Sequence, residues 1–208
     1  LPGGDVPRLF DTVARAVAAR SFNGREVVVL TSNLEGLPLA INLMANLANF
    51  GHQHALMLAD HPATCRALAS SRSPPACVFS SLLRREYRQT LRMYVSNPVW
   101  ILWLQRYMYF LRLIRLGLSP LLLDADILLF HDPYPHLHKA MGNFTLFVLC
   151  DSSAGYAATN GGVLYASNAS ATGPVHHIFS EFERRVLSVL KAGPSGIIRF
   201  DVSAGHRV

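Results

Sequence analysis

The sequence predicts an α/β fold in which a mostly parallel, Rossmann-like sheet is flanked by helices. From residue 26 onward, short apolar runs alternate with segments of helical periodicity, as in βαβ units with right-handed crossovers. Half of the 208 residues are hydrophobic and only 15% are charged, so the chain can bury a sizeable core. Polar residues follow the apolar runs at 31–33, 60 and 124–126, where such sheets bind ligands.

Six apolar runs predict strands, at residues 26–31, 55–60, 77–79, 121–130, 144–150 and 163–166. Five periodic segments predict helices, at residues 5–20, 39–50, 62–70, 99–116 and 175–192. Pro38 is tolerated at the first turn of the second helix, and Gly51 and Gly117 stop the helices that precede them. We interpret the segment around Tyr134-Pro135 as a loop that carries three histidines. No linker divides the chain, so we expect residues 1–208 to form one domain.

The composition excludes a disordered chain, and we expect no membrane span. The most apolar stretch, residues 98–117, is interrupted by one Gln and three Arg, so no run reaches about 18 apolar residues. The net charge of +6 comes mainly from scattered arginines, 17 against 2 lysines, whereas nucleic acid favours a denser stripe that includes lysine. We therefore expect no nucleic-acid partner. A phosphate-bearing small substrate or an acidic polymer suits this charge.

Cysteines and glycosylation sequons give a mild indication of the secretory lumen. The three cysteines show neither metal-ligand spacing nor a disulfide framework, although Cys65 and Cys77 are close enough in sequence to pair. Asn143-Phe-Thr145 and Asn168-Ala-Ser170 are sequons for N-glycosylation. The chain begins at Leu1 without a signal or anchor, so we expect a trimmed domain or a fragment.

Asp124-Ala125-Asp126 is the sharpest motif, because it sits within the apolar segment LLLDADILLF. An unpaired buried carboxylate is costly, so both carboxylates must be solvated at a strand end or neutralised by a cation. Side chains two apart on a strand point the same way, and oxygen ligands suit Mg²⁺ or Mn²⁺. The alternative is an ion pair or a capping role.

Arg106 is the second candidate, since it lies off the polar stripe of the 99–116 helix with apolar residues one turn away. An arginine on an apolar face snorkels out, forms a structural salt bridge, or binds an anion such as a substrate phosphate. The sequence leaves these alternatives open.

The order of motifs resembles that of the nucleotide-diphospho-sugar transferases of plants and green algae, glycosyltransferase family seventy-seven. The similar run is WLQRYMYFLRLIRLGLSPLLLDADILLFHDPYPHL, with Leu116-Gly117, the D-x-D and Asp132-Pro133 in the family's order. Downstream, Cys150-Asp151-Ser152-Ser153 and Asn160-Gly161-Gly162-Val163-Leu164-Tyr165 resemble its next two blocks. The resemblance covers roughly residues 25 to 190.

This resemblance implies a GT-A fold that binds a nucleotide sugar, with Mn²⁺ or Mg²⁺ held on the diphosphate by Asp124 and Asp126. It places Thr31, Asn33, Arg106, Asp124 and Ala125 at the nucleotide. It places Asn160, Gly161 and Gly162 at the sugar and acceptor. The resemblance also implies that the anomeric configuration of the sugar is retained. The sequence shows no dedicated catalytic base, and Asp151 is the candidate for a carboxylate near the anomeric carbon.

The implied reaction transfers a pentose or hexose from a UDP-sugar to a glycan or glycoprotein acceptor. It would take place in the Golgi lumen, in a type II membrane protein whose anchor lies outside this chain. The family continues with an Asp-Gln motif, whereas this chain has Phe200-Asp201-Val202, so part of the acceptor region is expected to be missing.

Two other functions compete with this one. The first is a non-catalytic GT-A remnant that binds nucleotide. The second is a phosphohydrolase of the haloacid dehalogenase type. In that class an apolar strand also precedes a D-x-D motif, and the first Asp is the nucleophile. The phosphohydrolase is disfavoured because the motif lies past the midpoint of the chain and no Asp-Asp pair follows.

Overall fold

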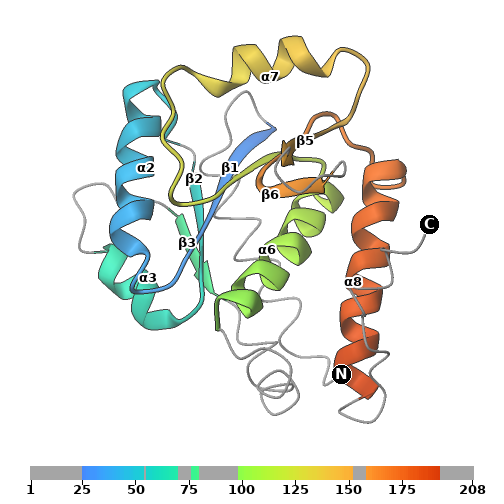
Figure 1. Cartoon of the computed structure of the whole chain (residues 1–208), viewed down its shortest axis with the longest axis horizontal. Coiled ribbons are helices and arrows are strands. Elements are labelled where there is room, and N and C mark those ends of the chain that lie inside the picture. The colour runs from blue at the N-terminus through green and yellow to red at the C-terminus, as the bar shows by residue number, and fades with distance from the viewer. Residues whose placement is uncertain (1–24, 54, 70–75, 80–97, 152–157, 193–208) are drawn as a thin grey trace.

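The computed structural model describes residues 25–53, 55–69, 76–79, 98–151 and 158–192, which form a six-stranded sheet with helices on both faces (Figure 1). The strands are β1 (Glu26–Ser32), β2 (Ala55–Ala59), β3 (Ala76–Phe79), β4 (Ser119–Leu123), β5 (Leu146–Asp151) and β6 (Ala158–Ala166). The helices are α2 (Leu37–Asn49), α3 (Pro62–Ala69), α6 (Pro98–Arg115), α7 (Pro133–Met141) and α8 (Pro174–Ala192). The helix predicted at residues 5–20 lies outside the described residues.

The strand order is β3-β2-β1-β4-β6-β5, so the sheet is mostly parallel, as predicted. Strands β1 to β4 run parallel to one another, whereas β6 pairs antiparallel with both β4 and β5. After β1 the chain adds β2 and β3 on one side and then returns through α6 to place β4 on the other side. The carboxyl ends of β1 and β4 therefore flank the point where the order reverses, which is where open α/β sheets bind ligands.

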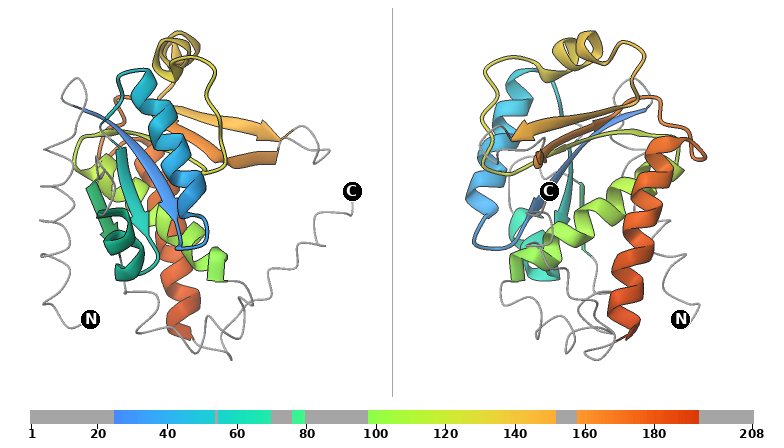
Figure 2. Two further views of the ribbon diagram at one scale, coloured as in Figure 1. Left: turned by 90° about the vertical axis from the view of Figure 1, so that its left-hand side faces the viewer. Right: turned by 45° about the vertical axis from the view of Figure 1, so that its right-hand side comes forward.

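Both faces of the central strands are buried, which explains why β1 and β4 read as continuous apolar runs. Val27 and Val29 pack with α6 and α8 on one face, while Val28 and Leu30 pack with α2, α3 and α7 on the other. Figure 2 shows α2 and α8 on opposite sides of the sheet. Because successive side chains alternate across a strand, Asp124, two residues after Leu122, belongs to the α6 face.

The glycines predicted to stop helices do so. Gly51 follows α2 with a φ of 83°, and Gly117 follows α6 with a φ of 76°. These left-handed conformations are open to glycine without a steric penalty, so each helix ends and turns toward the next strand.

Two predicted elements are wrong. The strand predicted at residues 121–130 ends at Leu123, because Asp124 begins a turn in which the Ile127 N–H donates to the Asp124 carbonyl (3.3 Å). The loop predicted around Tyr134-Pro135 is the helix α7, capped by Asp132, whose carboxylate accepts from the Tyr134 N–H (3.0 Å). Proline is compatible with a first turn, because N–H groups there have no partner within the helix.

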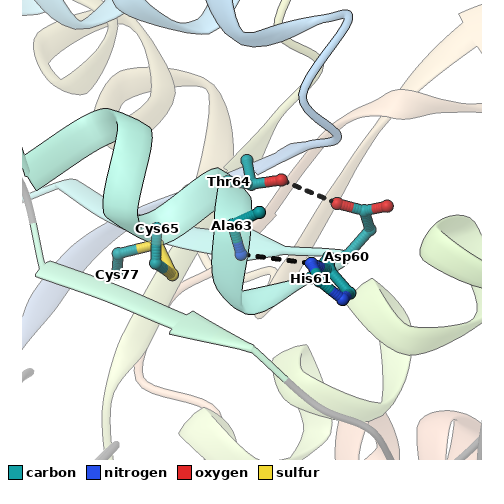
Figure 3. The surroundings of a disulfide bond; sticks show 6 residues. All are labelled: Asp60, His61, Ala63, Thr64, Cys65 and Cys77. Atoms are coloured by element: carbon teal, nitrogen blue, oxygen red, sulfur yellow. Dashed lines mark hydrogen bonds between the residues drawn. A yellow bond between two sulfur atoms is a disulfide. The ribbon is translucent and has the colours of Figure 1, made fainter.

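Cys65 of α3 and Cys77 of β3 form a disulfide, with Cα atoms 5.6 Å apart (Figure 3). The bond ties the edge strand β3 to the helix that precedes it. Cys150 is exposed and free.

Among the described helices, none combines the length and the apolar character needed to cross a bilayer.

We predict that only Cys150 reacts with iodoacetamide in the native protein, and that all three cysteines react after unfolding with reductant. Replacing Cys65 and Cys77 together by serine lowers the free energy of unfolding by about 2–3 kcal/mol, because the unfolded chain loses a short closed loop. Intact-mass spectrometry counts the labels, and urea unfolding measures the stability. Three labels on the native protein would contradict the bridge.

Candidate active site

The site is centred on Arg106, which lies on the buried face of α6 and is only 5% exposed at its side chain. Leu102, Tyr109 and Phe110 share this face and are buried. The guanidinium also lies against the rings of Trp103 and Tyr107, 5.7 and 5.0 Å from their centroids. The structure thus excludes snorkelling for this arginine.

The counter-charge of Arg106 is Asp124, whose Oδ1 accepts a hydrogen bond from Nη1. Nη2 donates to the Tyr107 hydroxyl (3.2 Å), whereas Nε is buried and has no hydrogen-bond partner among the described residues. The Asp124 side chain is 34% exposed, so the pair lies at the boundary between core and solvent. A salt bridge, one of the alternatives left open by the sequence, is what the structure shows.

Gly161 and Gly162 of β6 allow the backbone to approach this pair closely. A Cβ at Gly161 would lie 2.0 Å from the Tyr107 hydroxyl and 2.8 Å from Arg106 Nη2. A Cβ at Gly162 would lie 2.8 Å from Asp124 Oδ2. Gly162 also accepts from the Asp124 N–H (2.8 Å) and donates to Asn160 Oδ1 (2.7 Å). The Asn160-Gly161-Gly162 motif therefore packs directly against the Arg106–Asp124 pair.

The end of β1 lies at the same edge of the sheet. The last residue pair between β1 and β4 is Leu30 with Leu123, so Thr31 and Asp124 follow at equivalent positions. Thr31 is 8% exposed. Asn33 accepts from the Gly36 N–H through Oδ1 (2.7 Å), which shapes the turn into α2 and leaves its Nδ2 without a partner among the described residues.

Asp60 follows β2 at this edge as well. Its N–H donates to the Ser32 carbonyl (3.2 Å), and its carboxylate accepts from the Thr64 hydroxyl in the first turn of α3 (2.9 Å; Figure 3). This bond joins two side chains, whereas the helix N–H of Ala63 donates to His61 Nδ1 (3.1 Å), so His61 and not Asp60 caps α3.

Asp126 differs from Asp124 in being exposed and in forming no hydrogen bond or ion pair with the described residues. The two carboxylates lie in a turn, so the strand geometry expected to aim both in one direction is absent. Among the described residues, no group of three or more His, Cys, Asp or Glu side chains is arranged to hold a metal ion. The donors fit a hard cation that takes one exposed carboxylate, with its other ligands from phosphate oxygens and water.

The segment that carries the motif is fastened to α2. Asn46 accepts from the Leu129 N–H (2.8 Å) and donates to the Leu129 carbonyl (3.0 Å), as a neighbouring strand would. Buried His52, just beyond α2, lies 2.7 Å from Asp132, the capping residue of α7. Two contacts thus hold residues 124–132 in place.

The structure gathers most of the predicted site residues at one edge. Gly161 lies against Arg106, and Gly162 lies against Asp124 and Asn160. Thr31 and Asn33, at the end of β1, flank this group. Ala125 and Asp126 occupy the turn beside Asp124. Asp151 is the last residue of β5 and pairs with Ala158. The sequence gives no signal for Tyr107 and Asn46, which are ordinary residues of amphipathic helices, or for His52, which follows α2 and belongs to no motif.

No family model matches the chain, and no curated protein matches it either. One solved structure with a similar fold is the galactosyltransferase LgtC in complex with donor and acceptor sugar analogues. The TM-score is 0.47 at 15% sequence identity, with 78% of this chain and 66% of that chain covered. This chain therefore spans just under two-thirds of the length of LgtC.

At this identity and TM-score the similarity carries no argument about site or substrate, so the fold class rests on the strand order of the chain itself. That order confirms the predicted Rossmann-like, mostly parallel α/β sheet flanked by helices, as the resemblance to GT-A enzymes implies. Membership of glycosyltransferase family seventy-seven is supported by no family model and stays a prediction.

We predict that the two aspartates differ in their effect on stability. Asp124→Ala lowers the free energy of unfolding by about 2–4 kcal/mol, because it leaves the buried Arg106 without a counter-charge. Asp126→Ala changes it by less than about 0.5 kcal/mol, because this side chain is exposed. Urea unfolding followed by circular dichroism measures both. The double variant Arg106→Met/Asp124→Ala recovers part of the stability lost in Asp124→Ala. Equal losses in Asp124→Ala and Asp126→Ala would contradict the pairing of Asp124 with Arg106.

We predict that Asn46 holds the segment after β4 in place. Asn46→Ala removes both hydrogen bonds to Leu129, so amide hydrogen exchange across residues 124–131 accelerates by roughly tenfold, as expected for the loss of about 1.4 kcal/mol. Asn42→Ala is the matched control, since Asn42 is exposed one turn earlier on the same helix and the hydrogen bonds of this segment to α2 come from Asn46. Unchanged exchange in Asn46→Ala would show that the segment is held by other contacts.

Proposed function

We propose that this chain is a metal-dependent glycosyltransferase domain that uses a nucleoside diphosphate sugar. The observation that carries the proposal is the pairing of Arg106 with Asp124 beside the exposed Asp126, at the switch point between β1 and β4. Ligands of open α/β sheets bind in this crevice. A guanidinium and an exposed carboxylate there suit a diphosphate together with its cation.

The contacts of each residue indicate its role in the proposed reaction. Arg106 is fixed by Asp124 and the Tyr107 hydroxyl, so its contact with a phosphate would not require the ordering of a mobile side chain. Asp126 is free to take the cation, and Asp124 orients Arg106. Asn33 offers its Nδ2 donor at the end of β1. When bound, Mn²⁺ or Mg²⁺ stabilises the negative charge that develops on the leaving diphosphate.

The finer features extend this proposal. The donor would be a UDP-pentose or UDP-hexose, and the acceptor a glycan or glycoprotein. Asp151 would lie near the anomeric carbon, while Asn160, Gly161 and Gly162 would border the sugar and acceptor. The Golgi lumen, a type II anchor outside this chain and membership of family seventy-seven belong to the same proposal. The Cys65–Cys77 bridge supports an oxidising compartment.

A nucleotide-binding domain without transferase activity is the second candidate. It is favoured by the salt bridge on Asp124, which leaves Asp126 as the only carboxylate of the motif ready for a cation in the described structure. The same salt bridge argues against a phosphohydrolase, because the first Asp of that motif would have to attack phosphorus as a free nucleophile.

We predict that UDP binds the chain more tightly with Mn²⁺ than with EDTA, and that Asp126→Ala removes this difference, at least about tenfold in Kd, because the cation loses its exposed ligand. Isothermal titration calorimetry measures both affinities. Glu181→Gln is the control, since it neutralises a solvent-accessible carboxylate on α8 that belongs to neither the D-x-D motif nor the strand ends of the switch point. Absence of UDP binding with Mn²⁺ would overturn both the transferase and the nucleotide-binding domain.

Turnover distinguishes these two candidates. A transferase releases UDP from UDP-arabinose, UDP-xylose or UDP-galactose in a Mn²⁺-dependent manner, and Asp126→Ala slows this release by at least about a hundredfold through the lost stabilisation of the leaving group. Metal-dependent binding without release from any donor would favour the nucleotide-binding domain.

A further inference from the structure

A pocket of about 540 Å³ lies at the amino ends of the parallel strands, and its lining includes none of the residues of the candidate active site. Its lining includes Arg25 and Glu26 at the start of β1, Ser119 at the start of β4, His138 of α7, and Asn143 and Asn168. Thr31 lies five positions after Glu26 on β1, so the pocket lies about 17 Å from the switch point at roughly 3.3 Å per residue.

A hydrogen-bonded cluster forms one wall of this pocket. Glu26 Oε1 accepts from the Tyr165 hydroxyl (2.6 Å) and lies 2.6 Å from His138 Nε2. Burial, followed by the neighbouring Glu26, raises the pKa of Tyr165, so its hydroxyl stays protonated and donates. These contacts link β1 to α7 and β6, the two elements that directly precede the loops carrying Asn143 and Asn168.

The two rim loops carry the two sequons of the described chain. Asn143 is exposed between α7 and β5, and Asn168 is exposed after β6 with a φ of 49°. The hydroxyl positions are Thr145, half-buried, and Ser170, exposed, and the middle residues are Phe144 and Ala169 rather than proline. Phe144 is 76% exposed beside Asn143 and offers an apolar ring to an attached sugar.

Sequons arise often by chance, but these two share features that chance does not require. Both asparagines are exposed, both line one pocket, and both lie at the end of the sheet remote from the candidate active site. A glycan added before folding would therefore obstruct neither the core nor the switch point. The Cys65–Cys77 bridge independently favours an oxidising compartment, the kind in which N-glycosylation occurs.

We propose that Asn143 and Asn168 are both N-glycosylated, and that the two glycans cover the amino-end pocket. The donor is a lipid-linked oligosaccharide diphosphate. A bond forms between Asn Nδ2 and C1 of the first sugar as the bond from C1 to the diphosphate oxygen breaks. Nδ2 gives up one proton, and the lipid diphosphate leaves. This inference does not depend on the proposed transferase activity.

The test expresses the full chain behind a signal peptide in a eukaryotic secretory host. Peptide N-glycosidase treatment in heavy-oxygen water marks each formerly glycosylated asparagine as a labelled aspartate, which peptide mass spectrometry locates. The expected result is labelling at Asn143 and Asn168 in both the intracellular and the secreted protein. Reading the intracellular pool keeps the result independent of secretion.

Matched variants separate the sequon from the asparagine itself. Thr145→Ala and Ser170→Ala each remove one glycan while keeping the asparagine, whereas Thr145→Ser and Ser170→Thr keep both glycans. Asn42→Gln, at an exposed asparagine outside any sequon, also keeps both. Absence of labelling at Asn143 or at Asn168 overturns the assignment at that residue.

A further measurement tests where the glycans lie. Chymotrypsin cleavage after Phe144 should be at least about tenfold slower in the glycosylated protein than after enzymatic deglycosylation, because the glycan on Asn143 shields a residue that the fold leaves exposed. Equal cleavage rates would overturn the covering role while leaving the modification itself to the labelling result.

Discussion

The charge of Arg106 on the buried face of α6 is the constraint around which the candidate site is arranged. A guanidinium that is 5% exposed must have a counter-charge and hydrogen-bond acceptors, and Asp124 and the Tyr107 hydroxyl supply them. This requirement is met by Asp124, which directly follows β4 on the α6 side of the sheet. The Arg106–Asp124 pair also makes β6 carry Gly161 and Gly162, because any side chain there would collide with Tyr107, Arg106 or Asp124.

The segment after β4 is held from the opposite side of the sheet. Asn46 bonds both backbone groups of Leu129, and His52 lies against Asp132, so α2 fixes a stretch that has no regular structure of its own. The exposed Asp126 is thus carried on an anchored turn rather than on a free loop. The opposite end of the sheet is organised by Glu26, His138 and Tyr165, so the two ends present different surfaces, one charged and one bordered by the sequons.

Much of the site could be predicted because its residues break the pattern around them. Two aspartates in an apolar run and an arginine on an apolar helix face are costly in isolation, so each indicates a partner. The identity of that partner could not be predicted, since the Arg106–Asp124 contact spans 18 residues and depends on how α6 packs on β4. Asn46 gave no signal, because an asparagine on a helix surface is ordinary until its neighbour is known. The helix α7 was missed because two prolines read as a loop, although both occupy a first turn, where their missing N–H groups have no cost.

The sequence by itself determined the order of the described strands and of every described helix except α7, the glycine stops after α2 and α6, and the α/β class. These follow from local periodicity and from backbone conformations open to few residues. The tertiary structure alone decided that Asp124 serves Arg106 while Asp126 stays exposed, that Cys65 pairs with Cys77, and that Asn143 and Asn168 share one pocket. These outcomes depend on contacts between residues far apart or on separate elements. Burial and electrostatic pairing are properties of the packed chain, and the amino-acid pattern shows only that they are needed.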